Sequence, residues 1–440
     1  MSTIAAISTP VGAGGIGILR VSGEDALKIA DAIFVCKKKS AAETLRQNPL
    51  KLCFGDFIAE DFRDRGYAVY FPADKAYTGE ETTEFYLHGG VRIMQGALAA
   101  AVAAGARMAE RGEFTKRAFL AGRMSLADAE GVADMINAES AAGLRAAYRL
   151  MDGSVAKRIN VIADRLLEVM TGLEAVLDYP EETEDEVLPP LGGELEGLLS
   201  EVDSLISTAR RGRIAKHGIT AVLAGRPNAG KSSLMNALLG EDRAIVTAVA
   251  GTTRDTVEGS FECDGVRVNL IDTAGLRQSN DVVESMGISR AVQAARNADV
   301  VLLVTDTTRE DDGEYDFGGV RVFRIRNKCD LTSYACPRMR DCFAVSAKEG
   351  VNVEQLRHAI AALYKEGEVA GEELITSERH VSALYRAKSA LKSAIEAIDG
   401  TVDCVLVDLR EAYEALGEIT GRTATESIVD NIFSKFCVGK

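Results

Sequence analysis

The segment Gly225-Arg-Pro-Asn-Ala-Gly-Lys-Ser232 has the spacing of a loop that binds nucleotide phosphates. Its glycines let backbone N–H groups close around phosphate oxygens, the Lys231 ammonium neutralises the β and γ oxygens, and the Ser232 hydroxyl can ligate Mg²⁺. The loop follows the apolar run Ile219 to Ala224 and precedes a helix that we expect to start at Ser233. Strand, loop and helix in this order are the context that the motif requires. The segment therefore predicts a nucleotide site.

Three further motifs follow later apolar runs. Asp272-Thr-Ala-Gly275 comes directly after Val266 to Ile271, where a carboxylate can reach the metal through water and a glycine N–H can sense the γ-phosphate. In Asn327-Lys-Cys-Asp330, the last carboxylate can accept hydrogen bonds from guanine N1–H and the exocyclic amine, a pairing that adenine does not offer. Ser346-Ala-Lys348 offers backbone groups to the guanine oxygen. Together the motifs predict that the nucleotide is GTP.

The expected GTP-binding residues lie in these four motifs or in the switch segment Gly251-Thr-Thr-Arg-Asp255 and the run before it. A switch segment supplies a second Mg²⁺ ligand, and we assign that role to Thr253 beside Ser232. The expected GTP-binding residues are Asn228, Ala229, Gly230, Lys231, Ser232, Ser233, Thr247, Thr252, Thr253, Asp272, Thr273, Ala274, Gly275, Asn327, Lys328, Asp330, Ser346, Ala347 and Lys348.

The residue after Gly275 is Leu276, where Ras-like GTPases carry the glutamine that orients the attacking water. Hydrolysis therefore needs another polar residue and another source of positive charge. Asn228 and the run Thr247 to Thr252 could ligate a monovalent cation beside the phosphates. Glu284, in the polar segment after the motif, is a candidate to orient water.

The pattern of apolar residues predicts three domains that would position this chemistry. Residues 1–118 alternate short β-rich runs with an alanine-rich helical stretch, which predicts a small α/β domain. Residues 119–214 and 372–440 show helical periodicity on both sides of residues 215–371, whose β-rich runs alternate with helical segments. The prediction is a parallel doubly wound G domain, with a phosphate-binding loop, inserted into a discontinuous helical domain. Pro180 to Glu186 and the cluster Pro189, Pro190, Gly192 and Gly193 are expected to interrupt the helices as a loop.

The composition is that of a globular chain, with 47% apolar and 27% charged residues, and no apolar run approaches the eighteen or so residues that cross a bilayer. The N-terminus lacks the pattern of a secretory signal, so we expect a cytoplasmic protein without a membrane anchor. A net charge of −15 means that any contact with RNA needs a local basic patch or a partner protein. Eight scattered cysteines and four histidines offer little material for a zinc site, and the thiols are expected to be reduced and mostly buried.

The chain resembles the MnmE (TrmE) family of tRNA-modifying GTPases over almost its whole length. Near the start, the markers are Thr3-Ile-Ala-Ala with Thr9-Pro10, and Gly14-Gly-Ile-Gly-Ile-Leu-Arg-Val-Ser-Gly23. Further along come Tyr77-Thr-Gly-Glu80, His88-Gly-Gly90, Gly112-Glu-Phe-Thr115 and Arg117-Ala-Phe-Leu120. The terminal Phe436-Cys-Val-Gly-Lys440, together with the N-terminal set, separates this family from other GTPases.

The resemblance implies an N-terminal domain that forms a homodimer and binds 5-formyltetrahydrofolate or a related folate, and a G domain that uses Mg²⁺ and K⁺. It also implies an FAD-dependent MnmG (GidA)-type partner in a hetero-oligomer, and an aminomethyl-type modification at C5 of the wobble uridine of tRNA. By residue-wise matching, the folate contacts are Arg20, Glu84, Arg123 and Lys440; the K⁺ ligands are Asn228, Thr247, Val249 and Thr252; the Mg²⁺ ligands are Ser232 and Thr253; and the catalytic glutamate is Glu284.

Three residues add to this comparison. Arg123 stands where the family usually has lysine, which keeps the charge and changes the donor geometry. Arg111 replaces the proline that usually precedes Gly112. Cys437, in the terminal motif, can be read as a nucleophile or, more commonly for such a cysteine, as a buried structural thiol.

Two other functions stay open at this point. A ribosome-assembly GTPase would have similar G-domain motifs and no modification chemistry, and it would have no use for the Arg20, Glu84 and Lys440 set. A folate-dependent one-carbon transferase with a regulatory G domain would act on a small molecule and would need neither a flavoprotein nor tRNA.

Overall fold

The computed structural model describes residues 2–36, 39–240, 259–272, 295–296, 298–308, 315–332, 341–366 and 372–440, with the backbone alone for residues 180–189. The chain divides into two compact units. The first contains Met1–Ala133, Leu150–Ser200 and Ala383–Lys440, and the second contains Asp134–Arg149 and Glu201–Ser382. The expected boundaries at residues 118, 214 and 371 stay predictions.

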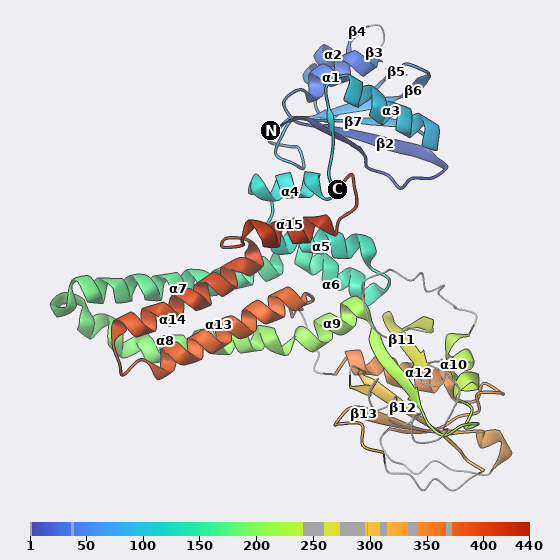
Figure 1. Ribbon diagram of the computed structural model, residues 1–440, viewed down its shortest axis with the longest axis vertical. Helices are drawn as coiled ribbons and strands as arrows, with labels where there is room; N and C mark the ends of the chain where they lie inside the picture. Colours follow the sequence, from blue (N-terminus) through green and yellow to red (C-terminus); the bar gives the residue numbers. More distant parts are fainter. Residues whose placement is uncertain are drawn as a thin grey trace. The chain divides into compact units, whose positions relative to one another are not determined.

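The first unit begins with an eight-stranded sheet covered by helices (Figure 1). Its strands are β1 (Ile4–Ile7), β2 (Gly14–Ser22), β3 (Phe34–Cys36), β4 (Lys39–Ser40), β5 (Cys53–Ile58), β6 (Arg63–Phe71), β7 (Thr82–Gly89) and β8 (Arg107–Met108), in the order β4-β3-β5-β6-β7-β2-β1-β8. The helices are α1 (Ala26–Ile33), α2 (Ala41–Gln47) and α3 (Val91–Ala103). Side chains from these helices and from the strands form one apolar core. The pairing is antiparallel except between β1 and β8.

Strand β7 lies in the middle of this sheet, and its sequence gives no clear strand pattern. Its residues are buried on both faces, with only His88 exposed. The sequence Thr82-Thr-Glu-Phe-Tyr-Leu-His-Gly89 therefore lacks the apolar and polar alternation that marks a half-buried strand. Polar residues inside it form hydrogen bonds with other parts of the unit: Glu84 accepts from Arg20 on β2, and Thr83 donates to the Ala26 carbonyl on α1.

The helices that follow are α4 (Glu113–Leu120), α5 (Leu126–Asn137), α6 (Ala141–Met151), α7 (Ser154–Asp178), α8 (Pro180–Ser207), α9 (Ala209–His217), α13 (Glu378–Glu396), α14 (Val402–Thr420) and α15 (Glu426–Ser434). Helix α7 buries a stripe of apolar residues spaced three and four apart, from Val155 to Val176. It packs beside α14, which comes from beyond the second sheet in sequence (Figure 1). Among the described helices, none is long and apolar enough to cross a membrane.

The prediction of a loop between Pro180 and Gly193 is wrong, because helix α8 runs through the whole segment. Pro180 is its first residue, a position where the missing N–H costs no helical hydrogen bond. After the prolines, the helix buries an apolar stripe made of Leu191, Leu195, Leu198, Val202 and Leu205. Burial of this stripe continues the helix through a segment whose local composition favours a turn.

The second unit holds a six-stranded sheet in the order β10-β11-β9-β12-β13-β14. Its strands are β9 (Ile219–Ala224), β10 (Gly259–Cys263), β11 (Val266–Asp272), β12 (Val300–Asp306), β13 (Arg321–Asn327) and β14 (Cys342–Ala344). The helical segments are α10 (Lys231–Leu239), α12 (Val353–Ala361), η1 (Cys329–Leu331) and η2 (Ala362–Tyr364). Strands β9 and β12 are buried on both faces, which explains why they read as unbroken apolar runs.

Two details of this unit differ from the expectation. The sheet is parallel from β11 to β14, but its edge strand β10 pairs antiparallel with β11. Strand β10 was missed because its five residues, Gly259 to Cys263, include the buried polar Ser260 and so show neither an unbroken apolar run nor a regular alternation. Helix α10 begins at Lys231, two residues before the expected Ser233, so the phosphate loop runs directly into the helix.

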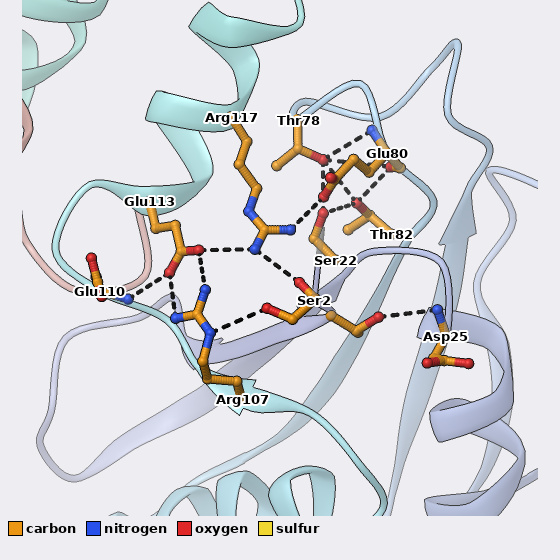
Figure 2. Close-up of polar contacts among 11 residues, drawn as sticks. Ser2, Ser22, Asp25, Thr78, Glu80, Thr82, Arg107, Glu110, Glu113 and Arg117 are labelled. Carbon is orange, nitrogen blue, oxygen red and sulfur yellow. Dashed lines mark hydrogen bonds and ion pairs between the residues drawn. The ribbon is translucent and has the colours of Figure 1, made fainter. Parts of the chain in front are cut away.

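A buried arginine fixes helix α4 against the first sheet (Figure 2). Arg117 is 5% exposed, and its guanidinium bonds Glu80 at 2.7 Å, Glu113 at 2.8 Å and the Ser2 carbonyl at 2.9 Å. Glu113 also accepts from Arg107 at 2.5 Å. Figure 2 shows how these groups join the first residues of the chain, the Thr78–Thr82 segment and α4. The network therefore ties together the parts of the chain that carry the N-terminal motifs.

This network should give the first unit a specific loss of stability in acid. Burial by itself raises the pKa of Glu113, but the hydrogen bonds from Arg107, the Glu110 backbone and Arg117 outweigh it and lower the pKa from 4.5 to about 2. A lowered folded-state pKa stabilises the folded chain above the unfolded pKa and ceases to do so as pH falls toward the folded value. The unsubstituted chain should have a larger free energy of unfolding than a Glu113→Gln variant. This difference should be largest near neutral pH and should shrink between about pH 4.5 and about pH 2.

Urea unfolding across that range measures the difference. Glu110→Gln, at an exposed position beside the network, is the matched control and should differ from the unsubstituted chain by a small amount at every pH. A Glu113→Gln difference that stays constant down to pH 3 would contradict the assigned pKa.

Candidate guanine-nucleotide site

The phosphate loop lies between the end of β9 and the start of α10. Gly225 has φ +141° and Gly230 has φ +93°, and both approach other backbone and amide groups closely. A Cβ at Gly225 would lie 2.2 Å from the Val304 carbonyl oxygen, and a Cβ at Gly230 would lie 2.2 Å from Asn327 Nδ2. No other residue type fits these two positions, which is the physical reason for the glycine spacing. The Lys231 ammonium donates to the Gly225 carbonyl at 2.9 Å, so its charge lies at the loop.

Asn327 at the end of β13 links two loops of the site. Its Nδ2 donates to the Ala229 carbonyl at 3.0 Å, and its Oδ1 accepts from the Ala347 N–H at 3.1 Å. The side chain is 2% exposed. The amide therefore holds the phosphate loop and the Ser346 to Lys348 loop at a fixed separation.

Lys328 forms a second link, through a partner that sequence reasoning missed. Its ammonium pairs with Asp306 at 2.5 Å and donates to the Asn228 carbonyl at 3.2 Å. Burial alone raises the pKa of Asp306, but hydrogen bonds from Lys328 and Thr308 outweigh it and lower the pKa to about 2, so the carboxylate stays charged. Asp306 is the last residue of β12. Asp306 could have been predicted from the sequence, because ligand-binding residues of parallel sheets lie at the carboxyl ends of strands.

The other expected residues of the described part lie at the same edge of the sheet. Asp272 is the last residue of β11, is 4% exposed and pairs in register with Leu223 beside the phosphate loop. Asp330 lies in η1 and is exposed, while the Cys329 N–H before it donates to the Val345 carbonyl at 3.1 Å. Ser346 is fully buried and bridges Val351. Parallel strands bring these separate motifs to one rim, which faces the loop that would hold the phosphates.

The structure thus brings together thirteen of the expected GTP-binding residues: Asn228, Ala229, Gly230, Lys231, Ser232, Ser233, Asp272, Asn327, Lys328, Asp330, Ser346, Ala347 and Lys348. The remaining expected residues lie outside the described residues: Thr247, Val249, Thr252, Thr253, Thr273, Ala274, Gly275 and Glu284.

In the first unit, Arg20 and Glu84 are brought together as the sequence comparison implied. They are register partners on β2 and β7, and Arg20 Nε donates to Glu84 Oε1 at 2.7 Å. The other carboxylate oxygen accepts from Tyr86 Oη at 2.9 Å. The guanidinium of Arg20 lies 5.5 Å from the centre of the Phe114 ring, and the Phe114 N–H donates to the Lys440 carbonyl at 3.2 Å. The last residue of the chain therefore lies next to the residue that packs on the Arg20–Glu84 pair.

Arg123 and Cys437 add two observations on the same unit. Arg123 donates to the Ala73 carbonyl at 2.6 Å, which ties the end of α4 to the segment between β6 and β7. The expectation that Cys437 is a buried structural thiol is wrong, because Cys437 is exposed. Its backbone carbonyl accepts from Gly112 N–H, and the following Val438 bridges Arg111, so the terminal segment lies on the surface of the fold.

The wider expectation about cysteines also fails. Of the seven described cysteines, only Cys36 and Cys263 are buried, and Cys404 is exposed like Cys437. The apolar cores of both units are filled by leucine, isoleucine, valine, alanine and phenylalanine, which leaves most thiols at partly exposed positions.

A glycine-shaped phosphate loop after β9, a buried carboxylate at the end of β11 and an Asn-Lys-Cys-Asp segment after β13 define a P-loop GTPase. The family model described as the GTP-binding protein TrmE N-terminus matches residues 3–123, and the model described as the MnmE helical domain matches residues 126–437. The chain therefore belongs to the MnmE family of tRNA modification GTPases.

Curated relatives named tRNA modification GTPase MnmE match along the whole chain. The protein of Syntrophus aciditrophicus is 40% identical over 457 residues, covering 100% of this chain and 99% of its own. That of Acetivibrio thermocellus is 37% identical over 458 residues, with the same two shares. Among solved structures, Era of Aquifex aeolicus, bound to GDP and aluminium fluoride, is 27% identical over 39% of this chain and 66% of its own. The TM-score of that pair is 0.26.

Replacing Asn327 with alanine should weaken GTP binding strongly. The substitution leaves the Ala229 carbonyl and the Ala347 N–H without their buried partner, at a cost of about 1 to 3 kcal/mol for each group. Because both loops then lose their fixed separation, the Kd for GTP should rise roughly tenfold to a hundredfold. Calorimetric titration with GTP measures this change.

The matched control is Asn269→Ala. Asn269 is 8% exposed, and its Nδ2 donates to the His217 carbonyl at 2.7 Å, at the opposite end of the strands. Both variants should lower the melting temperature, and only Asn327→Ala should raise the Kd for GTP. Equal GTP affinities in the two variants would show that Asn327 acts on stability alone.

Proposed function

We propose that this chain is a potassium-activated GTPase acting in tRNA modification. In this proposal it works in the cytoplasm as a homodimer with an FAD-dependent MnmG (GidA)-type partner. The two proteins install an aminomethyl-type group at C5 of the wobble uridine, using a one-carbon unit from 5-formyltetrahydrofolate or a related folate. Family membership over the whole chain, with the nucleotide site in one unit and the Arg20–Glu84 pair in the other, is the observation that carries the proposal.

The donor groups of the second unit fit the two cations that the proposal needs. Ser232 lies in the first turn of α10, and the buried Asp272 ends β11 beside it, so a hydroxyl and a carboxylate are available to a hard divalent ion. Asn228, with φ +64°, is the described member of the proposed K⁺ ligands. When bound, Mg²⁺ and K⁺ supply positive charge against the charge that develops on the transferring phosphoryl group.

In this proposal, residues of the chain bind the phosphates, select the base and orient the attacking water. The Lys231 ammonium binds the β and γ phosphate oxygens, and Asp330 selects guanine by accepting its two N–H donors. Asn327 and the Lys328–Asp306 pair hold the phosphate loop against the base-binding loops, so that both ends of the nucleotide are bound in fixed geometry. Glu284 orients the attacking water in place of the glutamine that Leu276 replaces.

The Arg20–Glu84 pair fits a folate in its chemistry. Arg20 keeps 20% and Glu84 keeps 10% of the side chain exposed, so both reach the surface beside Phe114. A pteridine ring offers N–H donors and ring acceptors side by side, which a neighbouring carboxylate and guanidinium can bind together. Lys440, next to Phe114 through its carbonyl, would bind an anionic part of the folate. Arg123 donates from Nη2 to the Ala73 carbonyl, and its remaining N–H donors would be the groups that contact the folate.

The experiment that tests the proposal is the steady-state GTPase rate in KCl against the same concentration of NaCl. A large stimulation specific to potassium is expected, because Leu276 stands where the water-orienting glutamine would be and the proposed cation at Asn228 would supply positive charge beside the phosphates. Equal rates in the two salts would leave a GTPase, remove the potassium mechanism and favour a ribosome-assembly switch.

A second arm tests the folate. Calorimetric titration with 5-formyltetrahydrofolate should show binding that Arg20→Ala and Glu84→Gln remove. Absence of binding to the unsubstituted chain would favour the ribosome-assembly function. Folate-dependent transfer to a small molecule without flavoprotein and tRNA would replace the proposal with a one-carbon transferase.

A further inference from the structure

Three side chains with metal-ligating atoms meet at the edge of the second unit, away from the nucleotide motifs. Cys263 ends β10, Asp264 follows it in the turn to β11, and His358 lies on α12. His358 Nδ1 lies 3.6 Å from Cys263 Sγ and 3.1 Å from each carboxylate oxygen of Asp264. The ligand atoms of the three residues all lie within 4.8 Å of one another.

Without an ion, hydrogen bonds can hold the three groups, because a hydrogen on His358 Nδ1 can be shared by the two carboxylate oxygens and the Cys263 thiol has a hydrogen of its own. The same three side chains offer a sulfur, a nitrogen and a carboxylate oxygen to a cation. A cation between the three groups would satisfy all of them at once.

The separations match those of a tetrahedral zinc site. With Zn–S of about 2.3 Å and Zn–N of about 2.0 to 2.1 Å, a tetrahedral angle places sulfur and nitrogen about 3.5 Å apart, and nitrogen and oxygen about 3.4 Å apart. The observed separations are 3.6 Å and 3.1 Å. The sulfur and the carboxylate oxygen lie within 4.8 Å of each other, so side-chain shifts would bring this third pair to the same ion.

The backbone fixes the ligands before any ion arrives. Asp264 and Gly265 have φ +52° and +77°, as a two-residue hairpin of type I′ requires, so the turn holds Asp264 next to Cys263. Helix α12 is held by Leu356 and Ile360, which belong to the same apolar core as Cys263. The β10–β11 turn and helix α12 thus belong to one packed unit. The three side chains therefore lose little conformational freedom when a metal ion binds.

Exposure and charge also suit a dication. The side chains of His358 and Asp264 are 60% and 32% exposed, so an ion and a water ligand can enter from solvent. A thiolate and a carboxylate supply two negative charges. The positive charge of nearby Arg357 would repel a metal ion. Arg357 pairs with Glu354 at 2.9 Å and lies over the Phe261 ring, and the carboxylate partly neutralises that charge. Lys365 is also close enough to act on the thiol, and burial raises the pKa of Cys263, so binding must displace a proton.

We propose that Cys263, Asp264 and His358 form a binding site for a divalent transition-metal ion of the Zn²⁺ type, with water as the fourth ligand. The site is separate from the Mg²⁺ and K⁺ of the nucleotide. Bound metal fastens the β10–β11 hairpin to α12, which adds a cross-link between elements 95 residues apart in sequence.

Cobalt(II) is the probe that tests the proposal, because a Co²⁺–thiolate bond gives a near-ultraviolet charge-transfer band and tetrahedral Co²⁺ gives intense visible bands. The full chain, reduced and freed of metal by a chelator, is titrated with Co²⁺ in the presence of Mg²⁺ and GDP. We expect the thiolate band to saturate at one ion per chain and to vanish when Zn²⁺ is added. Co²⁺ at the nucleotide site would bind oxygen ligands and give no such band.

Variants assign the band to the three residues. Cys263→Ser should abolish it, and His358→Gln and Asp264→Asn should each weaken Co²⁺ binding at least tenfold, roughly as loss of a ligand does. Asparagine accepts the positive φ of position 264, and His358 is mostly exposed, so these two variants should fold even if Cys263→Ser does not. The control Cys404→Ser, at an exposed cysteine, should bind as the unsubstituted chain does.

Thermal unfolding gives a second readout. At the same Zn²⁺ concentration, the melting temperature should rise in the unsubstituted chain and rise less in His358→Gln. The proposal is overturned if the titration shows no saturable thiolate band, or if the band survives Cys263→Ser or disappears in Cys404→Ser.

Discussion

Asp330→Asn should lower the affinity for GTP by roughly a thousandfold or more, because a site built to accept donors from a base rejects a partner that no longer matches it. The carboxylate accepts from guanine N1–H and from the exocyclic amine, whereas an amide would present its own N–H to one of these donors. Two charge-assisted hydrogen bonds, of about 1.5 to 3 kcal/mol each, are then lost.

The same substitution should create affinity for xanthosine triphosphate, which carries a carbonyl where guanine carries the amine, so that the new amide N–H can donate to it. Asp330 is exposed on η1, and its position depends on the backbone bond from Cys329 to Val345. The melting temperature should therefore stay unchanged, which separates loss of recognition from loss of fold.

Competition between labelled GTP and each triphosphate measures the switch. Asp316→Asn is the matched control, since Asp316 is also exposed in this unit and accepts from the Gly318 N–H at 2.8 Å. It should bind GTP as the unsubstituted chain does. Undiminished GTP affinity in Asp330→Asn would remove Asp330 from the base-binding role.

Glu284→Ala should lower kcat for GTP hydrolysis by roughly a hundredfold to ten-thousandfold, the range for loss of a positioned acid or base group, while leaving the Kd for GTP unchanged. Orientation of water is needed in the transition state and not in the bound ground state, so the rate falls without a change in affinity. Leu276 cannot orient water, and the resemblance to the family implies that Glu284 does so. Glu284 lies outside the described residues.

Single-turnover hydrolysis and equilibrium binding of GTP, both in KCl, measure the two quantities separately. Glu366→Ala is a control at a partly exposed glutamate that pairs with Arg321 in the same unit, and its kcat should be unchanged. Equal losses of affinity and rate in Glu284→Ala would assign Glu284 to nucleotide binding and not to the positioning of water.

The nucleotide motifs were visible in the sequence alone because each is short and continuous, whereas Glu284 was found by matching residues to the family. The phosphate loop occupies eight consecutive residues, and its glycines are required by backbone angles and close approaches within the loop itself. Strands β9 and β12 were equally visible, because strands buried on both faces of a parallel sheet need unbroken apolar runs. Structural features that depend on residues adjacent in the chain can therefore be predicted from a short stretch of sequence.

Local composition was misleading where burial decided the outcome. Helix α8 continues through prolines and glycines because its later turns bury leucines. Strand β7 gives no clear strand pattern because its polar residues are buried against partners in other parts of the unit. In both cases the stabilising contacts come from residues distant in sequence, so no pattern within the segment records them.

The sequence by itself determined that this chain binds a guanine nucleotide and to which family it belongs, because both are written in short motifs and in matched residues along the chain. Only the tertiary structure decided how the site is held together. Asn327 reaches Ala229 across 98 positions, Lys328 finds Asp306, and Cys263 meets His358 across 95 positions. Such pairings are fixed when strands and helices pack into one core, since side-chain contact depends on distance in space and not on spacing in the sequence.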